Sequence, residues 1–239
     1  MIRSSGDDGD VEISPDSTPA TRPLRTALNG KLVSLAPLDA SAHARDLYES
    51  SSGPENEKLW QYLADGPFAD YASFRAVIEQ KANSDDAVFF AIAENTPGRA
   101  AGYASLMRAD VANRCVEVGN ILYTPRLQQT TAATEAMYLL ARHVFEELRY
   151  RRYEWKCNAR NEPSRRAALR LGFTFEGVFR QHMIVKGRNR DTAWFSMLDR
   201  EWPARKSAFE RWLDPSNFDE AGRQRKTLAT LVNEFRLTG

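Results

Sequence analysis

The residues best suited to chemistry lie mid-chain, where a polar loop over residues 126–131 leads into an expected helix. The unpaired N–H groups and the dipole of a helix N-terminus attract anions. The small residues Thr131, Ala132 and Ala133 would let a diphosphate approach the backbone. The pattern therefore predicts an anion-binding loop, and an ordinary threonine-capped helix without a ligand fits the same spacing.

A second polar segment covers residues 158–177 and has the sequence NARNEPSRRAALRLGFTFEG. Asn161 is expected to cap a helix over Glu162–Leu171, because Pro163 suits the first turn of a helix. Four arginines supply positive charge around the two segments, and a solvated helix face explains at least half of them equally well: Arg126, Arg160, Arg165 and Arg166.

The elements that must position these residues predict an α/β (α+β) fold with a mixed sheet and helices on both faces. Apolar alternation and turn signals predict strands over residues 32–38, 88–94, 100–107, 115–123, 152–157, 173–185 and 191–198. Apolar residues three and four apart predict helices over residues 39–50, 56–63, 71–82, 131–148, 162–171, 203–213 and 220–235.

Three segments differ in composition. Residues 1–25 are rich in Ser, Asp, Pro, Thr and Gly, and we expect a disordered acidic tail, either a solvated leader or a docking arm. Residues 26–201 carry the periodic pattern of a folded domain, and residues 202–239 are expected to form a helical extension.

Composition excludes several classes of protein. The 239 residues carry 33 Lys and Arg against 32 Asp and Glu, and this balance argues against a dedicated nucleic-acid-binding protein. The longest apolar stretch, residues 87–93, is far shorter than a membrane-spanning helix. Two cysteines and three histidines are too few for a disulfide framework or a four-ligand zinc site. We therefore expect a soluble, cytoplasmic protein without a metal.

The motif NxxSxxxALRxGFxxEG over residues 161–177 resembles the GNAT superfamily of acyl-CoA-dependent N-acetyltransferases, in particular its RimJ/RimL type. The resemblance covers about residues 31–201. The preceding loop is similar to the pyrophosphate-binding segment of that family, Q/R-x-x-G-x-G/A, with Thr131 in place of the usual glycine. The residues of this segment are Gln128, Gln129, Thr130, Thr131, Ala132 and Ala133.

The resemblance implies acetyl-CoA as cosubstrate, and a small amine or a protein N-terminus as acceptor. It also implies that two parallel strands, ending at Tyr123 and Cys157, splay apart so that the pantetheine arm pairs with exposed backbone. Gly119 and Asn120 lie where a bulge would open the ladder. The N–H of Asn120 or Leu122 would then polarise the acetyl carbonyl.

Acetyl transfer needs a base for the amine and a proton for the departing thiolate. The position of Glu117 matches the general-base glutamate of many GNAT enzymes, and a salt-bridged carboxylate is the alternative. His182 is the rival base or a structural histidine. Ser164 is the candidate acid or a serine bonded to the helix backbone. Asn161 and Arg165 are expected to contact the cofactor.

Cys157 ends a strand beside the expected sulfur position, but we expect direct transfer and no disulfide with Cys115. Two other function classes stay open: an acyl-CoA-binding module without activity, and an interaction domain whose C-terminal helices cover a homodimer face. Five aromatic residues either line the acceptor site or pack in the core: Trp60, Tyr62, Phe68, Tyr71 and Phe74.

Overall fold

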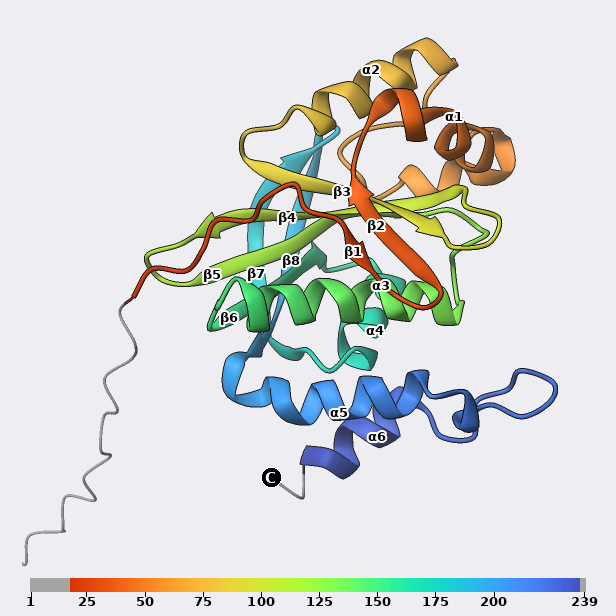
Figure 1. Ribbon diagram of the computed structural model, residues 1–239. Coiled ribbons are helices and arrows are strands. Elements are labelled where there is room, and N and C mark those ends of the chain that lie inside the picture. The colour runs from red at the N-terminus through yellow and green to blue at the C-terminus, as the bar shows by residue number, and fades with distance from the viewer. Residues whose placement is uncertain (1–17, 237–239) are drawn as a thin grey trace, which may run out of the picture.

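An eight-stranded sheet runs through the molecule in the order β1-β2-β3-β4-β5-β6-β8-β7 (Figure 1). The computed structural model describes residues 18–236. Only β5 and β6 pair in parallel within this region, so the predicted mixed, mostly antiparallel sheet is confirmed. The strands are β1 (Leu28–Asn29), β2 (Val33–Pro37), β3 (Ala87–Glu94), β4 (Ala100–Asp110), β5 (Cys115–Tyr123), β6 (Arg152–Asn158), β7 (Thr174–Val185) and β8 (Arg188–Leu198).

Helices cover both faces of the sheet, as the sequence predicts (Figure 1). On one face lie α1 (Ala40–Ser51) and α2 (Tyr71–Ala82), which share a core cluster with β3 and β4. The aspartates that precede these two helices cap them, because the Asp39 and Asp70 carboxylates accept the N–H groups of the first turn. The opposite face carries α3 (Thr131–Arg142), α4 (Glu162–Arg170), α5 (Trp202–Leu213) and α6 (Leu228–Arg236).

Three expected helices differ from the structure. The helix expected over residues 131–148 is an α-helix only as far as Arg142, and residues His143–Glu147 form a π-helix. Residues Pro54–Trp60 form a 3-10 helix instead of an α-helix over 56–63, and it follows Gly53, whose φ is 92°. The last helix begins at Leu228 and not at residue 220. There the Asp219 carboxylate accepts the N–H groups of Ala221 and Arg223 and closes a turn.

Both ends of the described chain pack on the domain. The N–H of Ala20 donates to the carbonyl of Val111, and that of Thr21 donates to the carbonyl of Leu148, so part of the tail expected to be disordered packs on the domain. Residues 1–17 lie outside the described residues. Trp202 of α5 stacks on Phe145, with ring centroids 5.2 Å apart, and the larger core also includes Leu228 of α6. The C-terminal helices therefore share one core with the preceding domain.

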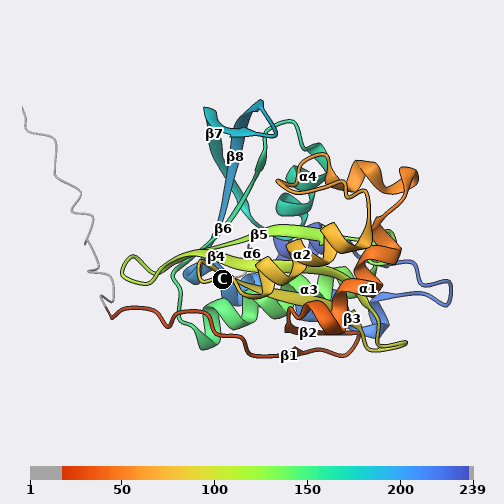
Figure 2. The same cartoon turned by 90° about the horizontal axis from the view of Figure 1, so that it is seen from above.

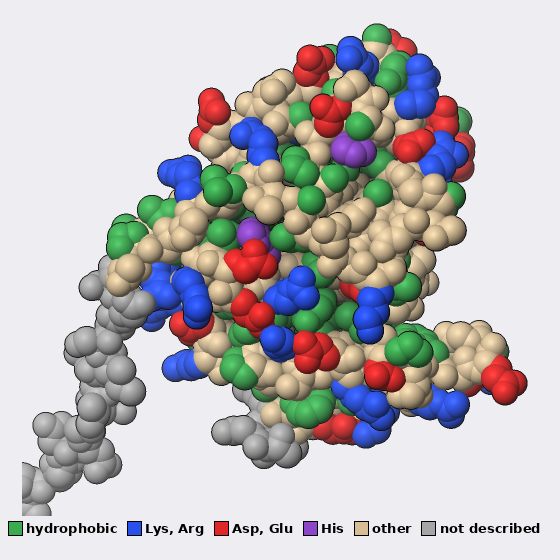
Figure 3. Space-filling model, in the orientation of Figure 1, with side chains coloured by type: hydrophobic (Ala, Val, Ile, Leu, Met, Phe, Trp, Pro, Cys, Tyr) green, Lys and Arg blue, Asp and Glu red, His purple; other side chains and the backbone are tan. Residues whose placement is uncertain are grey.

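Charges of both signs are interspersed over the visible face in Figure 3. This distribution agrees with the net charge of +1. Among residues 18–236, no helix has the length and apolar character needed to span a membrane. Nor does this region place three or more His, Cys, Asp or Glu side chains so that they could hold a metal ion.

Candidate functional site

The two parallel strands separate partway along their length. The pairing of β5 with β6 runs from Cys115 opposite Arg152 to Val118 opposite Trp155, and it stops there. Beyond this point β6, β8 and β7 turn away from β5 (Figure 2). The predicted splay is thus confirmed, and it leaves the facing edges of residues 119–123 and 156–158 without a strand between them. Such edges can accept an extended ligand as an additional strand.

A bulge shapes β5 where the two strands part, at the start of the opening between residues 119–123 and 156–158, which we call the cleft. The register with β4 passes from Gly119 opposite Ser105 to Leu122 opposite Tyr103, which leaves two residues of β5 against one of β4. Asn120 has a φ of 52°, a left-handed conformation that asparagine adopts more readily than most residues. The bulge expected at Gly119 and Asn120 is therefore present, and it redirects the backbone at the cleft.

A buried lysine holds the side chain of Asn120. Lys81, at the end of α2, is 8% exposed, and its Nζ donates to Asn120 Oδ1 at 3.3 Å. The same ammonium pairs with Asp65 Oδ2 at 2.6 Å. The sequence analysis missed Lys81, because the partners are distant in the sequence and a lysine in the last turn of a helix ordinarily faces water.

A row of ion pairs crosses the sheet on the face covered by α1 and α2. We call it the charge ladder, and it contains three cations and three carboxylates. Each contact between its neighbours is 2.6–3.0 Å long. In order from β4 to β7, its members are Arg108, Glu117, Lys156, Glu154, Arg152 and Glu176.

Glu117 uses one oxygen in the ladder. Its Oε2 receives both Arg108 and Lys156, at 2.8 and 3.0 Å, so the salt-bridged alternative is present. Its Oε1 makes no hydrogen bond within residues 18–236. That atom lies 3.1 Å from the position that a Cβ on Gly119 would occupy. The carboxylate thus keeps one oxygen directed toward the bulged part of β5, and its role as base stays a prediction.

His182 reaches the same face from β7. A register shift between Phe179 and Met183 bulges the strand, and the His182 Nδ1 lies 3.0 Å from Thr192 Oγ1. The His182 ring packs against Trp194, and Lys156 Nζ lies 3.9 Å from the centroid of the Trp194 ring. His182 and Glu117 are therefore linked through Trp194 and Lys156, without a contact between the two candidate bases.

Ser164 lies on the other face of β6. Its Oγ accepts the Trp155 Nε1–H at 3.0 Å, and its N–H donates to Asn161 Oδ1 at 3.2 Å. Burial raises the pKa of the neighbouring Cys157 thiol, which argues against a thiolate nucleophile. Cys115 and Cys157 are both free thiols.

The polar loop ends in a capped helix. Thr130 Oγ1 accepts the N–H of Ala133 at 3.1 Å, which leaves Thr131 and Ala132 at the open end of α3. Gln129, and not Thr131, has the left-handed backbone of the loop, with a φ of 61°. A cavity of about 340 Å³ adjoins this helix end and is also lined by Lys31. The N–H groups of Thr131 and Ala132 thus lie at this helix end, and anion binding there stays a prediction.

The sequence matches the acetyltransferase (GNAT) domain family over residues 33–174. The chain belongs to the GNAT acetyltransferase family. A GCN5-related N-acetyltransferase structure from Brucella melitensis is 49% identical, with a TM-score of 0.88, over 90% of this chain and 98% of that one. A probable GNAT-family acetyltransferase structure from Chromobacterium violaceum is 36% identical, with a TM-score of 0.74, over 85% of this chain and all of that one.

Among curated proteins, this GNAT chain is 33% identical over 109 residues to YdaF of Bacillus subtilis, provisionally named a ribosomal N-acetyltransferase. The match covers 46% of this chain and 59% of YdaF. The family resemblance and the fold expected from the sequence are confirmed. Acetyl-CoA is the acetyl donor in this family.

The four arginines expected near the cofactor of this GNAT protein fall into two groups. Arg126 pairs with Glu94 at 2.5 Å, and Arg165 pairs with Glu162 at 2.9 Å. Arg160 and Arg166 have exposed side chains. Arg126 and Arg165 form ion pairs that are neutral overall. The positive charges of exposed Arg160 and Arg166 are the ones that could act on cofactor phosphates.

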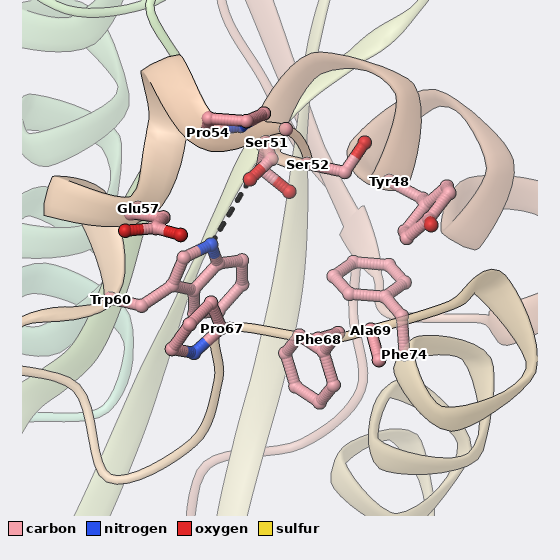
Figure 4. A pocket seen from close by; sticks show the side chains of 11 residues that line it. Tyr48, Ser51, Ser52, Pro54, Glu57, Trp60, Pro67, Phe68, Ala69 and Phe74 are labelled. Carbon is pink, nitrogen blue, oxygen red and sulfur yellow. Dashed lines mark hydrogen bonds between the residues drawn. The ribbon is translucent and has the colours of Figure 1, made fainter.

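The aromatic residues expected to line the acceptor site or the core also fall into two groups. Trp60 and Phe74 are buried, yet together with Tyr48 and Phe68 they line a cavity of about 450 Å³ (Figure 4). In contrast, the Tyr62 hydroxyl donates to the Arg160 carbonyl at 3.1 Å. The loop after Trp60 thus reaches the turn between β6 and α4.

The tip of the β7–β8 hairpin holds the same loop from the other side. Lys186 Nζ donates to the carbonyls of Trp60 and Asp65, each at 2.8 Å. Asp65 in turn pairs with Lys81, which holds Asn120. The loop over residues 60–65 is therefore tied to the hairpin and to the bulge.

Proposed function

We propose that this protein is an N-acetyltransferase that transfers the acetyl group of acetyl-CoA directly to a primary amine. The acceptor is a small-molecule amine, an amino-acid derivative or a protein N-terminus. The observation that carries the proposal is the separation of β5 and β6 beyond Val118 and Trp155, next to the bulge at Asn120. Facing strand edges suit a pantetheine arm, and the open end of α3 suits its phosphates.

The RimJ/RimL type is part of this proposal, supported by the motif over residues 161–177 and by the name of the Bacillus subtilis relative. The cytoplasm as place of action is also part of it. Two free cysteines suit a reducing compartment.

The residues of the cleft would divide the chemistry as follows. Acetyl-CoA supplies the thioester and the thiolate leaving group. The N–H of Asn120 or Leu122 donates to the carbonyl oxygen as negative charge develops on it. Glu117 Oε1 takes the proton of the ammonium group, directly or through water, and His182 is the alternative acceptor. Ser164 Oγ accepts from Trp155 and lies within hydrogen-bonding reach of the Cys157 thiol, and its hydroxyl hydrogen would donate to the departing thiolate.

At the other end of the cleft, the N–H groups of Thr131 and Ala132 would hold the pyrophosphate. Gln128 and Gln129 are exposed at this loop, and Thr130 and Ala133 fix the first turn of α3. Asn161 caps α4 beside Ser164, where we propose that it contacts the pantetheine arm. Arg165 is a weaker cofactor contact, since it already pairs with Glu162.

Two measurements test the proposal. Acetyl-CoA at millimolar concentration should raise the melting temperature, and the absence of a shift would refute an acyl-CoA site. Thiol release over a panel of amines and peptides should then depend on the acceptor. Binding without release on any acceptor would favour the acyl-CoA-binding module.

Glu117→Gln tests the base. We expect kcat to fall by about 10²–10⁴ with acetyl-CoA binding intact, since this is the usual contribution of a positioned base. Glu154→Gln is the matched control, because it removes a neighbouring carboxylate from the same charge ladder. If Glu117→Gln and Glu154→Gln lose kcat equally, the effect belongs to the charge ladder as a whole. If His182→Gln loses a factor of about 10²–10⁴ in kcat and Glu117→Gln does not, His182 is the base.

A further inference from the structure

Arg190 lies beyond the end of β6, at the mouth of the cleft. The pairing of β6 with β8 ends at Asn158 opposite Thr192, and Arg190 is two residues further along β8, opposite Met183 of β7. Its side chain is partly buried, and its Nε is fully buried without a hydrogen-bond partner in the described part of the chain. A guanidinium taken out of water in this way is unfavourable unless a partner arrives.

The surroundings of Arg190 place it at the candidate site. Burial lowers the pKa of its guanidinium, and the titratable groups that act on it are Cys157, Glu117 and Arg108. Thr192 and Trp194 follow on the same face of β8, because alternate residues of a strand share a face. Thr192 contacts His182, and the Trp194 Nε1 is a second buried donor without a partner among the described residues.

Glu117 is the acid with the largest effect on Arg190, but its Oε2 is paired with two cations of the charge ladder and it forms no ion pair with Arg190. The charge ladder pairs three cations with three carboxylates, so Arg190 is an additional positive charge beside it. Its sequence neighbour Asp191 accepts from the Gln181 N–H at 2.7 Å and from Asn189 Nδ2 at 2.9 Å. No ion pair of Arg190 is present within residues 18–236.

We infer that Arg190 binds an anionic group of the acceptor, a carboxylate or a phosphate, so that the preferred substrate carries an amine and an acid in one molecule. This inference rests on the proposed acetyl transfer. A planar guanidinium with several N–H donors matches a carboxylate or a phosphate in two-point geometry. The acid would be held at the mouth of the cleft by Arg190, while Glu117 or His182 takes the proton of the amine.

Matched acceptor pairs test the inference in the full-length protein. One pair is an α-amino acid and its carboxamide, and the other is an aminoalkyl phosphate and the parent amino alcohol. We expect the acidic member of one pair to have at least tenfold higher kcat/KM, and the pair that shows this identifies the anion. Arg190→Gln should lower kcat/KM for that acid by about 10² and leave its neutral partner within about twofold.

Arg188→Gln is the control, because Arg188 is exposed on the same strand. Arg190→Lys keeps the charge without the planar fork, and its kcat/KM for the acid should lie between those of wild type and Arg190→Gln. This ordering is also measurable if Arg190→Gln folds poorly.

Three results would overturn the inference and leave acetyl transfer standing. The first is a higher kcat/KM for the neutral member of both acceptor pairs. The second is an equal fall in kcat/KM for the acid and for its neutral partner in the Arg190 variants. The third is an acetyl-CoA-induced rise in melting temperature that is smaller in Arg190→Lys than in the wild type. The last result would make Arg190 a cofactor contact. Thiol release with none of the acceptors would instead overturn the proposed function, and the inference with it.

Discussion

Replacing Lys81 by methionine tests how the bulge on β5 is held. Lys81 Nζ contacts Asp65 at 2.6 Å and Asn120 at 3.3 Å, and methionine retains most of the apolar stem without these contacts. Removing one partner from a fully buried ion pair costs about 3–5 kcal/mol. The Lys81 side chain is 9% exposed, whereas that of Asp65 is 26% exposed and recovers part of its hydration. We therefore expect the free energy of unfolding to fall by about 2–3 kcal/mol.

The assay is urea unfolding of the wild type, Lys81→Met, Asp65→Asn and the double variant. Because the two side chains contact each other, the double variant should lose less than the sum of the single losses. Additive losses, or a Lys81→Met midpoint equal to that of the wild type, would refute the pairing. Ligand binding supplies a second readout. If Lys81 positions the bulge for the acetyl carbonyl, Lys81→Met should lower the affinity for acetyl-CoA more than the affinity for CoA.

Three further predictions concern other contacts. Glu135 accepts the N–H groups of Lys31, Leu32 and Val33, so Glu135→Ala should lower the unfolding free energy by about 2–4 kcal/mol in urea, and Glu135→Gln by less. A hydrogen bond from Arg152 holds the pKa of Glu176 below its ordinary 4.5. The stabilisation from the ionised Glu176 is complete above pH 4.5 and is lost as the pH falls through the lower folded-state pKa. The unfolding free energy of Glu176→Gln should therefore decrease less on acidification than that of the wild type. Cys115 is half-buried and Cys157 buried, so mass spectrometry should find alkylation at Cys115 first.

The local elements could be predicted where the sequence carries its own boundaries. The bounds predicted for α2 and β5 agree with the structure. Asp70 caps α2, and apolar residues occur along most of β5. Asn161 and Ser164 also lie where the motif suggests, at the start of α4. Features of this kind can be predicted because the interacting residues are only a few positions apart in the sequence.

The polar interior of the site could not be predicted in the same way. Arg108 meets Glu117 because a bulge gives Arg108 a φ of 49°, and Lys81 meets Asn120 from 39 positions away. No periodicity encodes such contacts, because they depend on how strands and helices are placed after folding. Arg190 shows the converse, since its importance rests on a partner that the described chain does not provide.

One ion pair bridges the two parallel strands at the point where they part. Glu117 immediately precedes the last paired residue of β5, and Lys156 immediately follows the last paired residue of β6. Their contact at 3.0 Å therefore spans the point where the two strands part. Both side chains are buried, so the pair is weakly screened by solvent. The carboxylate proposed to accept a proton thus also joins the two strands. Its Oε2 forms the ion pair with Lys156, and its Oε1 is left to accept the proton.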